Sequence, residues 1–458
     1  MKYQLRISGK HAKQMKKHLF PSDNMEAVSI ALCGHHKGDE LIILCVHEVF
    51  DIPYDQCRRS PDYVNWKTES LIPLIEKAAK LKLSVVKFHS HPGGFNRFSE
   101  LDDTSDWKLF PSIYGWIDGE HPHGSVVALP NGKFFGRVIG EDNNFQDFER
   151  IMVAGDTINI FCRTKSDVNP GMAIRNIQSF GLGTSELLKN MVVGVVGASG
   201  TGSPLIEQLV RLGMGKIIMI DPDIVELKNL NRILNTYKCH AETESFKVDV
   251  IKEAIKKIGF ETEVVSYTDN LYDSRDSIIA LISCDVIFGC VDSIDGRHLL
   301  NQISTFYCIP YFDIGIKLEA DGLGGINQIN GAVHFIQPGG SSLLSRGVYS
   351  IKGLEAATLK RENNDEYEMR LKEKYIVNVN VESPAVISVN MFVSSFCVND
   401  FLNRIHQYKG YAPSERAVTW LSLSEDMIFH DCDGVPDDYL AKKVGLGDQK
   451  PFLDVPGL

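Results

Sequence analysis

Two histidines and an aspartate lie close together in one short stretch of the chain. One residue separates His89 from His91, and Asp102 follows after a glycine-rich segment. The mostly apolar run at 83–88 is typical of a buried strand, in which alternate side chains share a face, so both imidazoles are expected to point to one side. Three protein ligands leave a fourth position for water, which is the arrangement of a catalytic zinc site. We therefore expect His89, His91 and Asp102 to bind one Zn²⁺.

A zinc-activated water needs a base, and Glu26 is the candidate. It belongs to an apolar stretch at 25–34 that is expected to form a strand. An unpaired carboxylate is costly in such a place, and this misfit suggests a catalytic role. The alternative interpretation is that the histidines are surface residues of a glycine-rich loop and bind nothing.

Together with Ser99, these residues resemble the JAMM motif of the JAB/MPN metalloprotease family, over roughly the first third of the chain. That family includes deubiquitinases, which hydrolyse the bond after the C-terminus of ubiquitin-like proteins. The resemblance implies that Glu26 is the general acid/base and that Ser99 hydrogen-bonds the water or the tetrahedral oxyanion. Amide hydrolysis requires the same roles on physical grounds: a Lewis acid, a proton shuttle and an oxyanion donor.

A glycine-rich turn further along the chain indicates a second chemistry. The apolar run 191–196 is followed by Gly197, Gly200 and Gly202, and then by an amphipathic helix. Such glycines let backbone amides approach a phosphate at the N-terminus of a helix. The next strand-like run ends at Asp221, where an acid suits the ribose hydroxyls of a nucleotide. These features alone also fit a nicotinamide-dependent oxidoreductase, which stays open as an alternative.

The continuation of the sequence favours ATP. Asn231 and Arg232 provide an amide and a guanidinium just beyond Asp221, where triphosphate oxygens would lie. Lys247, on an expected helix, adds a positive charge. Asp292 ends another apolar strand at the carboxyl edge of the sheet, where it is suited to hold Mg²⁺. A surface charge at Lys247 and helix capping by the two aspartates are the alternatives.

Residues 175–410 resemble the adenylating domain of the ThiF and ubiquitin-activating family. Members attack the α-phosphate of ATP with the C-terminal carboxylate of a ubiquitin-like protein, giving an acyl adenylate and pyrophosphate. The resemblance implies that the phosphate loop is formed by Gly197, Gly200 and Gly202 and that Asp221 binds the ribose. It also implies that the phosphates are contacted by Asn231, Arg232 and Lys247 and that Asp292 binds the metal. Arg175 resembles the arginine that one subunit of these dimers offers to its partner's ATP, and a solvated helix arginine is the alternative.

The sequence departs from this family in three places. Ser199 replaces the second glycine of the loop, so that turn must accept a Cβ. Serines at 341, 342 and 345 stand where many relatives carry half of a Cys-x-x-Cys zinc site, so we expect no structural zinc there. The segment 311–379 contains no cysteine to accept a thioester. We expect the acyl adenylate to be the final product or to pass to a partner, with Cys239 as a substitute acceptor.

Length and pattern predict how the elements are organised. A chain of 458 residues is too long for one core. We expect an α+β domain at 1–145, with strands near 26–33, 41–50, 83–88 and 125–129, the last entering a hairpin turn at Asn131-Gly132. A linker at 146–174, a doubly wound, Rossmann-like α/β domain at 175–410 and a tail of unknown role at 411–458 complete the predicted fold. The charged run 360–374 is expected to be a solvated helix, a crossover or a lid.

Composition restricts the partners and the compartment. The net charge of −11 argues against a role on nucleic acids or membrane surfaces. Ten scattered cysteines favour a reducing cytoplasm, the N-terminus lacks a signal-peptide core, and no long apolar run exists.

These observations predict a bifunctional enzyme that uses Zn²⁺, ATP and Mg²⁺, in a ubiquitin-like conjugation pathway of bacterial type. Its expected partners are a ubiquitin-like or sulfur-carrier-like protein, a conjugating enzyme and a second copy of the chain. Adenylation of a sulfur carrier or a peptide C-terminus in a biosynthetic pathway is the alternative function. A non-catalytic scaffold of two degenerate enzyme folds is a further alternative.

Overall fold

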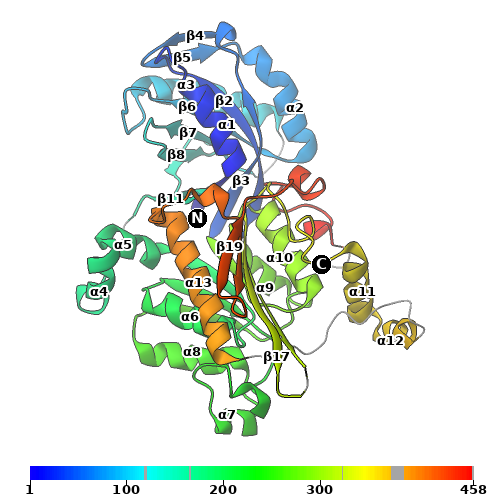
Figure 1. Cartoon of the computed structure of the whole chain (residues 1–458). Helices are drawn as coiled ribbons and strands as arrows, with labels where there is room; N and C mark the ends of the chain where they lie inside the picture. Colours follow the sequence, from blue (N-terminus) through cyan, green and yellow to red (C-terminus); the bar gives the residue numbers. More distant parts are fainter. Residues whose placement is uncertain (118–120, 165–166, 322, 373–385, 456–458) are drawn as a thin grey trace. The chain divides into compact units, whose positions relative to one another are not determined.

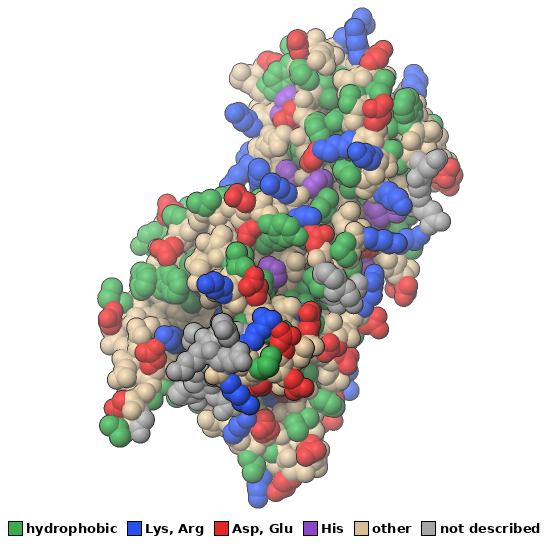
Figure 2. Space-filling model, turned by 90° about the vertical axis from the view of Figure 1, so that its right-hand side faces the viewer, with side chains coloured by type: hydrophobic (Ala, Val, Ile, Leu, Met, Phe, Trp, Pro, Cys, Tyr) green, Lys and Arg blue, Asp and Glu red, His purple; other side chains and the backbone are tan. Residues whose placement is uncertain are grey.

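The computed structural model describes residues 1–117, 121–164, 167–321, 323–372 and 386–455. The chain forms two compact units (Figure 1). The first comprises Met1–Thr164, Thr305–Cys308 and Lys442–Gly457, and the second comprises Lys165–Ser304 and Ile309–Ala441. Among the described residues, no helix is both long and apolar enough to cross a membrane. Basic and acidic side chains are interspersed on the face drawn in Figure 2.

The first unit is built on a nine-stranded mixed sheet in the order β11-β10-β1-β3-β2-β6-β7-β8-β9. Its strands are β1 (Lys2–Ser8), β2 (Val28–Lys37), β3 (Leu41–Asp51), β6 (Ser84–Ser90), β7 (His123–Ala128), β8 (Phe134–Ile139), β9 (Phe145–Asp147), β10 (Arg150–Ala154) and β11 (Ile158–Cys162). A separate hairpin pairs β4 (Cys57–Ser60) with β5 (Tyr63–Trp66). The predicted turn at Asn131-Gly132 connects β7 to β8, with Gly132 at a φ of +82°.

Two hydrophobic cores cover the two faces of this sheet. Helix α1 (Gly9–Leu19) packs with Leu5, Val86 and Phe88 on one face. Helices α2 (Ile72–Leu81) and α3 (Glu100–Trp116) pack with Ile30 and Val85 on the other. Since side chains alternate along a strand, the odd-numbered residues of β6 face α2 and α3. This alternation puts His89 beneath the helix that carries Asp102.

The segment 146–174, which we expected to be a linker, contains β10 and β11. Strand β10 pairs in parallel with β1, whose other edge pairs with β3. Residues 4–8 of β1 are buried, so their backbone groups need hydrogen-bond partners on both edges, and β10 supplies one of these edges. The polar residues at 141–144 form the turn between β8 and β9 rather than a boundary between domains.

Residues 442–455 belong to the first unit. The Gly34 amide donates to the Gly445 carbonyl at 3.1 Å, and the Asp448 amide donates to the His35 carbonyl at 2.8 Å. His36 Nδ1 lies 3.0 Å from the Asp448 carboxylate. A Cβ on Gly34 would overlap the Leu446 carbonyl. Part of the tail whose role the sequence left open therefore packs as backbone against β2.

The second unit has an eight-stranded sheet in the order β14-β13-β12-β15-β16-β17-β18-β19. Its strands are β12 (Val192–Val196), β13 (Lys216–Ile220), β14 (Glu263–Tyr267), β15 (Val286–Gly289), β16 (Tyr311–Ala320), β17 (Ile326–Ile336), β18 (Val418–Ser422) and β19 (Met427–Asp431). Neighbouring strands pair in parallel among β14, β13, β12, β15 and β16, and they pair antiparallel among β16, β17, β18 and β19. The chain order reverses between β12 and β15, which is where ligands bind in doubly wound sheets. The predicted α/β fold class is confirmed.

The helices of this unit lie before and between its strands, and several of them pack on the sheet (Figure 1). They are α4 (Pro170–Phe180), α5 (Leu182–Asn190), α6 (Gly202–Arg211), α7 (Lys238–Glu242), α8 (Lys247–Ile258), α9 (Arg275–Ile282), α10 (Ile294–Phe306), α11 (Ile351–Glu362), α12 (Asn364–Lys372) and α13 (Ile387–His406). The charged run at 360–374 lies at the end of α11 and in α12, and its last two residues lie outside the described part of the chain.

We predict that Gly34→Ala lowers the free energy of unfolding of the first unit by about 1 to 3 kcal/mol, the usual cost of overpacking. The new methyl group would collide with backbone of the C-terminal segment, which cannot move aside as a flexible side chain can. Chemical denaturation followed by tryptophan fluorescence measures the change. Gly93→Ala, at a position with open space around it, is the matched control. Equal stability of both variants would contradict the packing of this segment on β2.

Candidate metal centre and nucleotide cavity

The three predicted zinc ligands converge in the first unit. Strand β6 supplies His89, the turn after it supplies His91, and the first turn of α3 supplies Asp102. His89 Nε2 lies 2.9 Å from Asp102 Oδ1 and 3.2 Å from His91 Nε2, and His91 Nε2 lies 3.4 Å from Asp102 Oδ2. Both imidazoles are buried. The fold thus brings together the three ligands that the sequence predicted.

The spacing of these atoms fits zinc. In a tetrahedral site with bonds of about 2.1 Å, ligand atoms lie roughly 3.4 Å apart, and the observed distances are 2.9 to 3.4 Å. His91 Nδ1 lies 2.7 Å from the Phe95 carbonyl, which can only accept a hydrogen bond, so this nitrogen carries a proton and Nε2 is the nitrogen that can bind the metal. Burial lowers the pKa of His89 and favours the neutral form that binds metal. Burial raises the pKa of Asp102, but hydrogen bonds from both histidines outweigh it and hold that pKa well below its usual range.

Ser99 is placed to orient Asp102. It is the N-cap of α3, and its hydroxyl donates to Asp102 Oδ2 at 2.8 Å, while its backbone amide donates to the same oxygen at 2.7 Å. The Asp102 amide completes this capping box by donating to Ser99 Oγ. In this geometry the hydroxyl proton of Ser99 is directed at the ligand. Its expected bond to the water or oxyanion stays a prediction.

Glu26 borders the metal centre and lies two residues before β2 rather than inside it. Its Oε1 lies 4.0 Å from His91 Nε2, and its side chain is almost fully buried. Burial raises the pKa of Glu26 to about 8, and the attraction of His91 opposes the rise. A carboxyl group that titrates near neutral pH is suited to both accept and return a proton. Glu26, His89 and Asp102 also line a common cavity of about 320 Å³.

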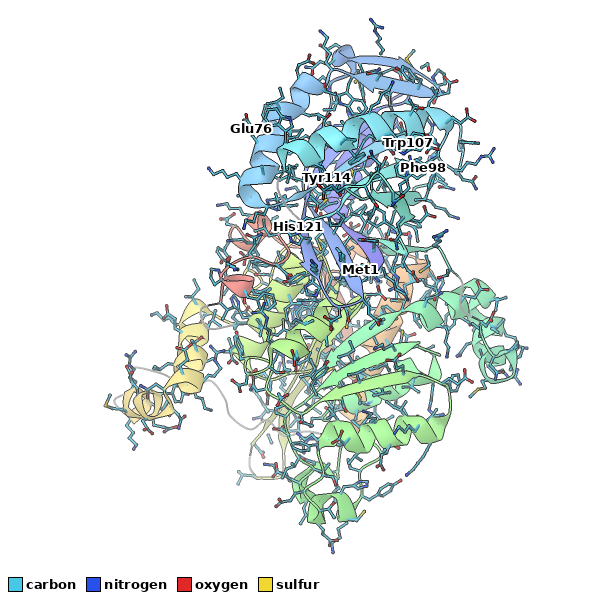
Figure 3. All side chains as sticks on the ribbon, turned by 180° about the vertical axis from the view of Figure 1, so that it is seen from behind. Met1, Glu76, Phe98, Trp107, Tyr114 and His121 are labelled. Carbon is cyan, nitrogen blue, oxygen red and sulfur yellow. The ribbon has the colours of Figure 1, made fainter. Side chains whose placement is uncertain are left out.

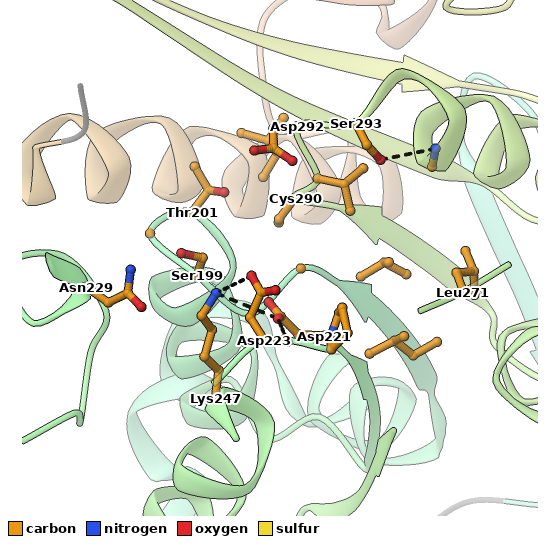
Figure 4. Close-up of a pocket in the computed structure, with 18 of the residues that line it drawn as sticks. Ser199, Thr201, Asp221, Asp223, Asn229, Lys247, Leu271, Cys290, Asp292 and Ser293 are labelled. Atoms are coloured by element: carbon orange, nitrogen blue, oxygen red, sulfur yellow. Dashed lines mark hydrogen bonds and ion pairs between the residues drawn. The ribbon is translucent and has the colours of Figure 1, made fainter. Parts of the chain in front are cut away.

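The nucleotide residues of the second unit line a cavity of about 910 Å³ at the carboxyl ends of the parallel strands. Side chains from several elements point into this space (Figure 4). The predicted residues in its wall are Gly197, Gly200, Asp221, Asn231, Arg232, Lys247 and Asp292. Gly202 lies just behind it, at the first residue of α6. The sequence thus predicted the wall of the cavity from segments up to 95 residues apart.

The glycine turn is packed too tightly for side chains. Gly197 has a φ of +91°, and a Cβ there would collide with the Cys290 carbonyl. A Cβ on Gly202 would overlap the carbonyl of Gly197 itself. Ser199 does not have a positive φ, and its carbonyl accepts the Ser203 amide at 2.9 Å as part of the first helical turn. The Cβ of Ser199 is therefore accommodated without backbone strain.

Asp221 is fixed by backbone donors and a lysine. Its Oδ2 accepts the Ala198 amide at 2.6 Å, and its Oδ1 accepts the Asp223 amide at 2.9 Å. Lys247 Nζ lies 3.8 Å from Asp221 and 2.6 Å from Asp223. Burial raises the pKa of Asp221, and Lys247 opposes this. Because Lys247 is buried at the side of Asp221, the surface-charge interpretation of Lys247 is excluded.

Further residues in the cavity wall were not predicted. Arg297 lies in the first turn of α10, five residues after Asp292, and its Nε lies 3.2 Å from Asp313 Oδ1, which raises the arginine's pKa. Arg297 lies at the start of the helix that follows β15 and Asp292, and this position is a local signal that could have identified it. Lys360 and Asn390 come from α11 and α13. Lys360 begins the charged run that the sequence offered as a possible lid, whereas no local pattern marks Asn390, since only the fold brings α13 to the cavity.

Besides Gly202, two more predicted residues lie outside the wall of this cavity. Arg175 is exposed on α4, where its guanidinium donates to Gln178 at 3.1 Å. Cys239 is exposed on α7. Their expected roles, contact with a second copy and acceptance of an acyl group, stay predictions.

The serines that replace cysteines take part in a hydrogen-bonded cluster. The Ser341 hydroxyl donates to Asp433, and the Ser342 hydroxyl donates to Asp437 at 2.6 Å. Arg346 donates to Ser341 at 2.7 Å and pairs with Asp433 at 3.0 Å. These contacts connect two segments about 90 residues apart, in the place where the sequence led us to expect no structural zinc.

Comparisons with known proteins match both parts of the chain and confirm the resemblance. The model of the ThiF family matches residues 173–432, and that of prokaryotic homologs of the JAB domain matches residues 8–132. Ubiquitin-like modifier-activating enzyme 5 of Drosophila pseudoobscura pseudoobscura is 25% identical over 210 residues, which are 43% of this chain and 50% of that protein. The same enzyme of Bombyx mori is 29% identical over the same shares. The chain spans about half the length of these relatives. A crystal structure of E. coli MccB with MccA-N7isoASN covers 59% of this chain and 76% of that one, at 18% identity and a TM-score of 0.46.

We predict that the purified protein binds one equivalent of zinc and that His89→Ala abolishes the binding, because two ligands cannot hold the ion tightly. Glu26→Gln should keep the zinc but lower peptidase turnover roughly a hundredfold, the usual scale for a lost general base. Metal analysis after dialysis measures the first result and hydrolysis of a ubiquitin-like fusion measures the second. Full zinc content in His89→Ala would contradict the assignment.

Proposed function

Because the chain belongs to the ThiF family, we propose that its second unit uses ATP to adenylate the C-terminal carboxylate of a peptide or ubiquitin-like protein. The observation that carries this proposal is the convergence of the glycine turn, Asp221, Arg232 and Asp292 on one cavity. An oxidoreductase has no need of Arg232 and Asp292 in that place. The curated relatives are named as enzymes that activate ubiquitin-like modifiers, which supports the same substrate class.

In the proposed reaction, a carboxylate oxygen attacks the α-phosphorus of ATP. An acyl–phosphate bond forms, the bond between the α-phosphorus and its bridging oxygen breaks, and pyrophosphate leaves. Asp221 accepts hydrogen bonds from the ribose hydroxyls, while the amides at the start of α6 face the phosphates. Arg232 and Lys247 offset the negative charge of the phosphates. Asp292 is the residue to hold Mg²⁺, which when bound would neutralise charge on the phosphates.

For the first unit we propose zinc-dependent hydrolysis of a peptide or isopeptide bond next to a ubiquitin-like C-terminus. The match to prokaryotic JAB homologs and the spacing of His89, His91 and Asp102 support it. Zinc, when bound, would polarise the attacking water and the scissile carbonyl. Glu26 takes the proton of the water and returns it to the leaving nitrogen.

The two proposed activities fit one pathway. The first unit either exposes the carboxylate that the second activates or removes the modifier from its targets. We propose a cytoplasmic homodimer in which Arg175 serves the neighbouring copy, with a conjugating enzyme as acceptor. A sulfur carrier is the alternative substrate, and the mass of the product formed with ATP distinguishes the two.

We predict that the protein exchanges labelled pyrophosphate into ATP when its protein substrate is present and that Asp292→Ala abolishes this exchange. Loss of the carboxylate removes the proposed Mg²⁺ ligand and with it several kcal/mol of transition-state stabilisation. The control is His89→Ala, which should exchange like the wild type because it alters only the metal centre of the first unit. Tight binding of NADH without binding of ATP would replace this proposal with the oxidoreductase alternative.

We further predict that the activated substrate stays non-covalent until a partner's nucleophile takes it. Burial raises the pKa of Cys45 and of Cys290, which lines the cavity, to about 12, and this disfavours their thiolates. A non-reducing gel of the reaction with ATP and the modifier tests this. A thiol-sensitive adduct that disappears in Cys239→Ala would instead identify Cys239 as the acceptor, and one that persists would identify another cysteine.

A further inference from the structure

A buried network of charges lies one helical turn beyond the metal centre. Lys87 of β6 and Arg137 of β8 both contact Asp106 of α3, and all three side chains are at most 5% exposed. Arg137 donates to Asp106 Oδ2 from Nη2 at 2.7 Å and from Nε at 3.2 Å. Its Nη1 donates to Asp103 at 2.6 Å. Two cations and two carboxylates thus balance inside the first unit.

The sheet sets the two cations in one row beneath the helix. Lys87 is opposite Ser125 on β7, and Ser125 is opposite Arg137 on β8. Side chains opposite each other on neighbouring strands point to the same face. Because the middle residue is a serine, the long side chains on either side of it reach one carboxylate. Asp106 is fully buried where they meet.

The network and the metal centre each contain one polar contact between β6 and α3. One contact joins His89 to Asp102 and the other joins Lys87 to Asp106. Two residues along a strand advance about 6.6 Å and four residues along a helix about 6 Å, so the two spacings match. The contact between Lys87 and Asp106 therefore fixes the position of α3 along β6, and with it the position of the Asp102 carboxylate.

Arg137 also contacts the loop that leads from His91 to Ser99. Its guanidinium lies 3.8 Å from the ring centres of both Phe98 and Phe145. Trp107 of α3 stacks on Phe145 at 5.6 Å. Phe98 and Trp107 are labelled in Figure 3, at the loop and on the helix. One side chain thus holds both the loop and the helix against the sheet.

We propose that Lys87, Asp106 and Arg137 are positioning residues that hold Asp102 in place to complete the metal centre. This inference rests on the proposed zinc peptidase function. A buried ion network contributes little net stability compared with apolar residues of similar volume, so stability does not explain it. Its hydrogen bonds have fixed directions, whereas apolar contacts allow a helix to slide by fractions of an ångström. A zinc ligand tolerates little displacement, since the length of its bond to zinc stays within about 0.2 Å of the ideal value.

The test is the zinc affinity of the full-length protein, measured by competition with a chromogenic chelator. Asp106→Asn keeps the shape of the side chain but removes its charge, and we expect the Kd for zinc to rise by about 10- to 100-fold. The matched control is Asp147→Asn, which weakens the exposed ion pair with Arg163 and should leave the Kd unchanged. Circular dichroism verifies that both variants are folded at the temperature of the assay.

A triple variant separates positioning from stability. Lys87→Met, Asp106→Leu and Arg137→Met together replace the network with apolar side chains, which should preserve folding while the zinc affinity falls as in Asp106→Asn. Wild-type affinity in folded Asp106→Asn or in the folded triple variant would overturn the inference, and Asp106→Asn decides alone if the triple variant does not fold. A wild-type protein that binds no zinc would overturn the proposed peptidase function as well, so the two failures are distinguishable.

Discussion

The buried carboxylates at and beside the two sites need partners that replace water, and the groups that supply these partners build the sites. Asp102 is held by two histidines and a helix cap, Asp106 by a lysine and an arginine, and Asp221 by two backbone amides and Lys247. Charges removed from water persist only where such partners are supplied. Compensation is incomplete at Asp221 and Glu26, because burial raises the pKa of both, and the pKa of Glu26 rises to about 8 since the attraction of His91 does not offset its burial. A carboxyl group that titrates in this range is suited to transfer protons.

The two sites are built from different arrangements of strands and helices. The metal centre joins a strand to the start of a helix, so its geometry depends on how α3 packs on β6. The nucleotide cavity lies where the strand order reverses, so its residues are brought together by the ends of parallel strands and by a turn that excludes side chains. Hydrogen bonds among Ser341, Arg346 and Asp433 connect distant segments of the same unit without thiolates.

Local sequence patterns predicted the individual helices, strands and turns better than the distant segments with which they pair. The strand before His89, the helix start at Asp102 and the turn at Asn131-Gly132 follow from short patterns, and the structure contains all three. The strands at 150–162 were expected to be a linker, and the C-terminal segment was given no role. Both are defined by pairing with residues far away in the chain, β10 with β1 and Gly445 with Gly34, and such pairing leaves little local trace. Asn390 was missed for the same reason.

The sequence by itself determined which chemistry is available, because imidazoles, carboxylates and closely spaced glycines have few uses in those combinations. It determined the ligands of the predicted metal, the acid beside the glycine turn and the separation into two sites. Only the tertiary structure decided how these groups are held: that Ser99 directs its proton to Asp102, that Lys247 is buried beside Asp221, and that Asp106 bridges Lys87 and Arg137. The reason is physical, since residue types fix what a group can donate or accept, whereas burial and distance fix which partner it meets.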